Sequence, residues 1–240
     1  MLCNFRLMLA TTVVLPISLV AGTAYAEPPA MSRSIGTGVT PAAGWTQLGS
    51  STTHTAGIAS STVAAPEIRA LARSLSREGT LSGDALARRV LDYVRNNIET
   101  EFRFGLGKGA RGAIIDQSGT PFDQADLMVR ILREAGATAS FRTGTITLSA
   151  DQFGKWTGLV TGLSEQNQTF TVSAKAACQF LADGGIPAQV NGGSECATRS
   201  GNLSTVTLSH VWVMTGGKAY DPSFKSNVLF AGIDIPAAMG

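Results

Sequence analysis

His210 and Asp221 are the two side chains in this sequence whose types and spacing best fit catalytic chemistry. A carboxylate that hydrogen-bonds an imidazole fixes the tautomer of the ring, and such a pair is the orienting half of a nucleophile–base–acid triad. The alternative is a hydrogen bond that only stabilises a hairpin. Both interpretations require that the chain bring the two side chains together.

A hairpin around Gly216-Gly217 is predicted to do this, because β-rich runs flank that two-residue turn signal. With a two-residue turn, Thr215 pairs with Lys218, which places Asp221 one diagonal step from His210 on the same face. Diagonal neighbours lie about 7–8 Å apart at Cα, within reach of these side chains.

Two further residues are candidates for a nucleophile. Asp123 lies three positions after Thr120 at the start of a predicted helix, where helix capping is the competing role. Cys178 lies well inside a predicted helix over residues 173–182, where a buried or disulfide-bonded thiol is the competing interpretation. We predict that Cys178 pairs with Cys196, which closes a loop worth about 3 kcal/mol of stabilisation.

The helix over residues 120–135 is the clearest element of the sequence. It begins with a capping-box pattern and a proline in its first turn, and Gly136 ends it. One side is broadly apolar, which is typical of a central helix. Helices are also predicted from Pro66 and from Ser82, and a strand over residues 139–148. Because helices come first and strands later, the pattern indicates an α+β fold with an antiparallel sheet.

Residues 102–115 are glycine-rich and predicted to form a loop, with a short strand at residues 113–115. Residues 105–110 match the residue spacing of a dinucleotide-binding fingerprint, but no helix is predicted to follow them, so we expect a loop without that function. Phe102, Phe104 and Trp156 fit either a cleft lining or core packing.

These segments resemble a known family. Residues 123–127 (DQADL) and 131–136 (ILREAG) resemble the core helix of transglutaminase-like domains, and residues 210–213 (HVWV) with 221–223 (DPS) resemble that family's His and Asp segments. The variant, with DPSFK over residues 221–225, is similar to domains in large exported YD-repeat (RHS-type) proteins. The resemblance covers roughly residues 91–224. It implies a papain-like fold with a nucleophilic Cys at the start of the central helix.

Pro121 stands where the resemblance places that Cys. Proline offers no nucleophile, so His210 and Asp221 are expected to be two members of a triad that lacks the first. The chain is then expected to be catalytically silent and to bind a protein, peptide or glycan, alone or within a larger chain or assembly. The alternative is an active amidase or acyltransferase that uses Cys178 or a carboxylate with His210 and Asp221. A purely structural module is the third interpretation.

The N-terminal residues predict export. A positive charge, an apolar run and the small-residue site Ala24-Tyr25-Ala26 are typical of a signal peptide over residues 1–26. The apolar run is shorter than the roughly 18–20 residues of a permanent membrane anchor. The mature chain is therefore expected in the periplasm or outside the cell, where disulfides persist. Residues 27–63 are predicted to be a flexible lead-in, or a few strands docked to the domain edge as Trp45 suggests, and residues 64–240 the domain.

Composition excludes several other classes. The formal net charge is +2, so no strong field favours nucleic acid or an anionic membrane. Two His and three Cys, without a Cys-x-x-Cys pair, argue against a metal site. No cofactor is expected.

Overall fold

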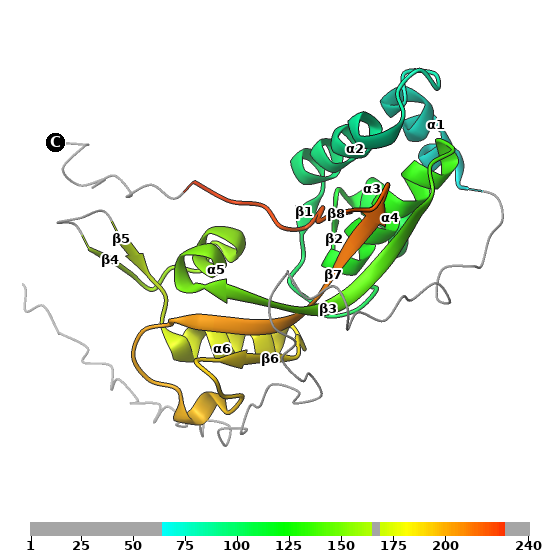
Figure 1. The fold of residues 1–240 in the computed structure, drawn as a ribbon. Coiled ribbons are helices and arrows are strands. Elements are labelled where there is room, and N and C mark those ends of the chain that lie inside the picture. Colours follow the sequence, from blue (N-terminus) through cyan, green and yellow to red (C-terminus); the bar gives the residue numbers. More distant parts are fainter. Residues whose placement is uncertain (1–63, 165–168, 229–240) are drawn as a thin grey trace, which may run out of the picture. The chain divides into compact units, whose positions relative to one another are not determined.

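The computed structural model describes residues 64–164 and 169–228 (Figure 1). The predicted signal peptide and the lead-in over residues 27–63 lie outside the described residues. The fold is α+β, as predicted, with an antiparallel sheet packed against helices. The helices are α1 (Pro66–Leu75), α2 (Gly83–Asn97), α3 (Gly109–Asp116), α4 (Pro121–Glu134), α5 (Ala150–Thr157) and α6 (Ala174–Asp183), with a 3₁₀ turn at Cys196–Thr198.

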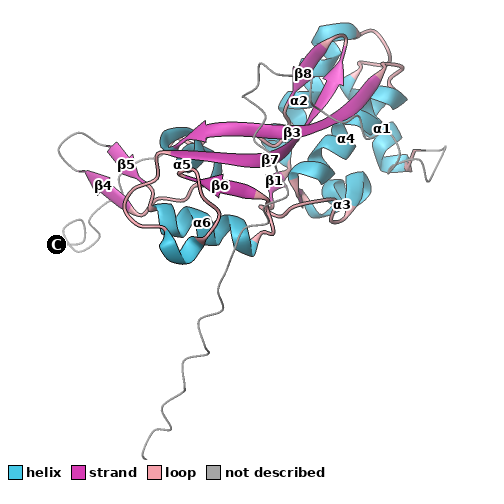
Figure 2. Cartoon of the chain, turned by 60° about the horizontal axis from the view of Figure 1, so that its bottom comes forward, coloured by secondary structure: helices cyan, strands magenta, loops and turns pink. Residues whose placement is uncertain are grey.

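The largest sheet of the described residues is built on one long ribbon. Strands β3 (Ala139–Ser149) and β7 (Thr205–Thr215) pair antiparallel over their whole lengths (Figure 2). Strand β6 (Ala188–Val190) pairs with the beginning of β7, and β8 (Lys218–Tyr220) pairs with its end. The short strands β1 (Glu99–Thr100) and β2 (Ser118–Gly119) pair in parallel, and β4 (Gly162–Ser164) pairs antiparallel with β5 (Thr169–Thr171).

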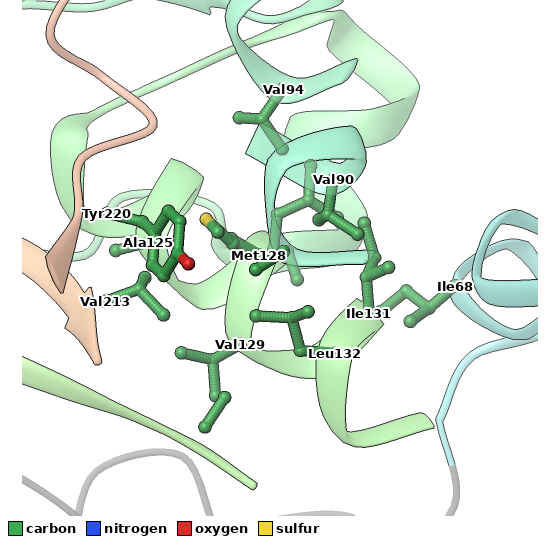
Figure 3. Close-up of a cluster of buried hydrophobic side chains, with 14 of the residues drawn as sticks. Ile68, Val90, Val94, Ala125, Met128, Val129, Ile131, Leu132, Val213 and Tyr220 are labelled. Atoms are coloured by element: carbon green, nitrogen blue, oxygen red, sulfur yellow. The ribbon is translucent and has the colours of Figure 1, made fainter. Parts of the chain in front are cut away.

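One face of this ribbon packs on α4, which in turn packs on α1 and α2. Phe141 and Val213 face this cluster, and α4 contributes most of its centre (Figure 3). The fully buried side chains of α4 include Leu127, Met128, Val129, Ile131 and Leu132. The prediction that this helix is central is confirmed.

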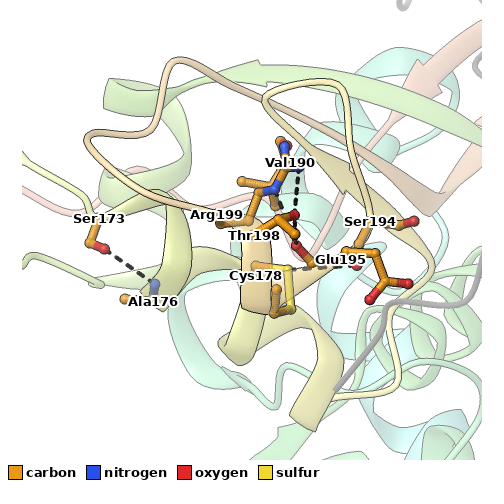
Figure 4. Close-up of a disulfide and its surroundings, with 9 residues drawn as sticks. Ser173, Ala176, Cys178, Val190, Ser194, Glu195, Thr198 and Arg199 are labelled. Carbon is orange, nitrogen blue, oxygen red and sulfur yellow. Dashed lines mark hydrogen bonds between the residues drawn. A yellow bond between two sulfur atoms is a disulfide. The ribbon is translucent and has the colours of Figure 1, made fainter. Parts of the chain in front are cut away.

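A second cluster covers the opposite face at the other end of the ribbon. Successive strand residues point to opposite faces, so Ile146 and Leu208 lie on the reverse side from Phe141 and Val213. They pack with side chains of α5, α6 and β6. The disulfide between Cys178 and Cys196 belongs to this cluster (Figure 4).

The prediction for residues 102–115 was wrong in one respect. Residues 109–116 form the helix α3, and no strand forms at residues 113–115. Glycine-rich composition conceals this helix, since glycine disfavours helices in isolation. Asp123 and Asp126 of α4 stabilise it by accepting hydrogen bonds from the backbone N–H groups of Gly109 and Ala110.

Candidate functional site

His210 and Asp221 meet as the hairpin predicts. Thr215 pairs with Lys218 across the two-residue turn. The Nε2 atom of His210 lies 2.7 Å from Oδ2 of Asp221, and both side chains are buried. A carboxylate on Nε2 leaves Nδ1 as the ring nitrogen available for another partner. None of the described residues hydrogen-bonds Nδ1.

Both the side chain and the main chain of Asp221 accept hydrogen bonds from neighbouring residues. Its second oxygen, Oδ1, accepts hydrogen bonds from the backbone N–H and hydroxyl of Ser223 and from the backbone N–H of Phe224. The guanidinium of Arg95, from α2, donates two hydrogen bonds to the backbone carbonyl of Asp221. The carboxylate is therefore fixed through both its side chain and its main chain.

The pKa of Asp221 follows from this environment. Burial favours the neutral acid and would raise the pKa, but the charge of His210 opposes it. Hydrogen bonds from His210, Ser223 and the backbone N–H of Phe224 also favour the carboxylate. The net effect holds the pKa of Asp221 below its ordinary value.

Trp156 of α5 covers the imidazole. Its ring meets that of His210 edge to face, with centroids 5.4 Å apart, and it stacks on Phe224 at 5.5 Å. Its indole N–H donates to the carbonyl of Ser223. The sequence offered core packing and cleft lining as alternatives for this residue, and the structure shows it buried against the dyad. The sequence pattern did not predict α5, the helix that places Trp156 against His210.

A short chain of contacts joins this site to the start of α4. The side-chain amide of Gln124 donates to the Thr100 hydroxyl at 3.0 Å. That hydroxyl lies 3.4 Å from the carbonyl of Ser223, the residue that also binds Asp221. The first turn of α4, which carries Pro121, is thereby linked to the dyad through β1.

Asp123 lies in that first turn but is committed to structure. Thr120 and Asp123 form the predicted capping box. The same carboxylate accepts hydrogen bonds from the backbone N–H groups of Gly107, Lys108 and Gly109, and its side chain is fully buried. Saturated in this way, it has little freedom to act as a nucleophile or base.

This arrangement also explains the glycine-rich loop. A helix does follow the fingerprint at residues 105–110, contrary to the sequence expectation, but an internal carboxylate occupies the N–H groups where a phosphate would bind. Asp126 accepts from the N–H of Ala110 in the same way. The two acids of α4 complete α3 and fill its N-terminus.

Cys178 carries no free thiol in this structure. Its sulfur is bonded to that of Cys196 at 2.08 Å, with the Cα atoms 5.4 Å apart, which confirms the predicted pairing. Cys178 lies in the middle of α6 and Cys196 begins a 3₁₀ turn (Figure 4). The bond ties the loop after β6 to the helix beneath it.

Among the residues described, no group of His, Cys, Asp or Glu side chains could hold a metal ion. Within the same residues, no helix is both long and apolar enough to span a membrane. No family model, curated protein or solved structure matches this chain.

Proposed function

We propose that this chain is an exported, transglutaminase-like domain of papain-like architecture that has lost covalent catalysis and serves as a binding or assembly module. The observation that carries the proposal is an ordered His210–Asp221 dyad in a chain whose described cysteines are joined to each other. A thiol mechanism needs a thiolate, a base and an orienting acid. The dyad supplies the last two only.

Pro121 accounts for the loss. It is the first residue of α4, the position that the resemblance assigns to the nucleophilic Cys. Proline has neither a reactive side chain nor a backbone N–H that could stabilise an oxyanion. The dyad then serves to hold the segment 221–224 against α2 and α5.

The proposal is tested by returning a thiol to that position. In Pro121→Cys, alkylation of the new thiol is expected to be at least about tenfold faster with His210 present than in the double variant with His210→Ala, since a nearby base raises the thiolate fraction. Ser82→Cys, at an exposed helix start, is the control, and its alkylation is expected to be independent of His210.

The unmodified protein is expected to show no transglutaminase or amidase turnover. If alkylation of the thiol introduced by Pro121→Cys does not respond to His210, Pro121 is not the nucleophile position. Turnover by the unmodified protein that His210→Ala abolishes would contradict the silent module.

A further inference from the structure

Strand β3 forms the edge of the largest described sheet. The strand order is β3-β7-β6, so β3 pairs with β7 on one side and with no other strand of the described residues. It is 11 residues long, contains no proline or lysine, and carries one charged side chain, Arg142. Natural edge strands are usually short or protected by proline, lysine or a bulge, because open edges pair with other chains.

The register identifies the backbone groups that line the open edge. The backbone N–H of Ser209 donates to the backbone carbonyl of Pro187, on the β6 side of β7. The backbone N–H and C=O groups of the odd-numbered residues of β7 therefore face away from β3. The backbone groups of His210 therefore face β3, where Gly144 is the paired residue. Along β3 the even-numbered residues bond β7, and Phe141, Thr143 and Thr147 present their backbone N–H and C=O groups outward.

We propose that residues 42–63 of this same chain add a strand to the outer edge of β3. This inference is independent of the proposed function, since it requires neither the dyad nor the family. Residues 42–63 contain no proline and no charged side chain, and they are rich in Thr and Ser. Such a segment can supply an unbroken, uncharged row of backbone donors and acceptors.

The point where the described chain begins supports this occupant. Ala64 and Ala65 pack against the cluster to which Ala139 and Phe141 of β3 belong. Residues 42–63 reach about 70 Å when extended, whereas β3 is about 36 Å long. A tether of this length keeps the segment at high effective concentration, which favours it over a separate chain.

Amide hydrogen exchange of the intact protein tests the proposal. With the edge paired, the amides of Phe141, Thr143 and Thr147 are expected to exchange about a hundredfold more slowly than free amides. A triple variant, Thr46→Pro, Thr53→Pro and Ile58→Pro, leaves no stretch of seven residues in 42–63 free of proline. It is expected to abolish most of this protection, while the same three positions changed to Ala retain it.

The amides of Arg142 and Gly144 point toward β7 and serve as the internal control. They are expected to stay protected in every variant, which shows that the ribbon itself remains folded. Fast exchange of Phe141, Thr143 and Thr147 in the unmodified protein would overturn the proposal. Protection that survives the prolines would also overturn it. If that protection rises with protein concentration, a second copy covers the edge; if it does not, another part of the chain does.

Discussion

The two hydrophobic clusters of the β3–β7 ribbon are stabilised in different ways. The cluster on α1, α2 and α4 is built from helices of 10, 15 and 14 residues and contains no covalent cross-link among its described residues. The other cluster is built from α5, α6 and the three-residue strand β6, and it contains the disulfide. Short elements bury less apolar surface apiece, so a cross-link compensates where helix packing is limited.

The dyad lies at the junction of these clusters. His210 shares a face with the second cluster, while Arg95 of α2 holds the main chain of Asp221. Each of the following changes is aimed at the junction, at the second cluster or at the first.

The largest effect is expected at the junction. Asp221→Ala removes the acceptor for His210, Ser223 and Phe224 from a buried site, which should cost about 4 kcal/mol in the free energy of unfolding. Denaturant unfolding measures the loss. Asp151→Ala, which breaks an exposed ion pair with Lys155, is the control and should cost less than about 0.5 kcal/mol. Equal costs for the two variants would contradict the structural role of Asp221.

The same carboxylate gives a pH dependence of known sign. Because its folded pKa is lower than its unfolded value, its contribution to stability is present above about pH 4 and is lost as the pH falls through the folded pKa. The free energy of unfolding should therefore decrease as the pH falls from about 5 to about 2. Asp221→Ala should decrease less steeply over that range. Parallel curves would show that Asp221 is not responsible.

The second cluster is broken by removing its cross-link. Changing Cys178 and Cys196 together to Ala should cost about 3 kcal/mol, with a lower melting temperature by about 6–12 °C. Hydrogen exchange should quicken in α6 and β6 more than in α4, which packs in the other cluster. Equal loss of protection in both clusters would show that they unfold as one unit.

The smallest change in the free energy of unfolding is expected in the first cluster, where it measures the contribution of helix capping. The Thr120 hydroxyl accepts the N–H of Asp123, whereas Ser82 occupies the N-cap of α2 without a capping hydrogen bond. Thr120→Ala should cost about 1 kcal/mol and Ser82→Ala only a few tenths. Thermal unfolding of both variants measures the difference, and a cost at Ser82 as large as that at Thr120 would reverse it.

The features predicted correctly are those with strong local signals. The capping box and apolar face of α4, the two-residue turn and the long strand β3 are each encoded within one short stretch. The His210–Asp221 contact followed from the turn register alone. The disulfide was predicted because removal of the predicted signal peptide, which contains Cys3, would leave two cysteines.

The features that were missed depend on distant residues. Helix α3 has a glycine-rich sequence and is completed by Asp123 and Asp126, which lie on another helix. Strand β6 has three residues, and α5 has eight with a glycine inside, so neither gives a clear period. Trp156 contacts His210 because α5 packs against that part of the sheet, which no local sequence pattern predicts.

The most direct test is the reactivity of the unmodified protein. Intact mass is measured after treatment of the native, non-reduced protein with a thiol-directed electrophile. With Cys178 and Cys196 bonded and Pro121 as the first residue of α4, protein that begins at Glu27, and so lacks Cys3, is expected to gain no adduct. An adduct on Cys178 that disappears in His210→Ala would contradict this expectation and would show that Cys178 acts as a nucleophile together with His210.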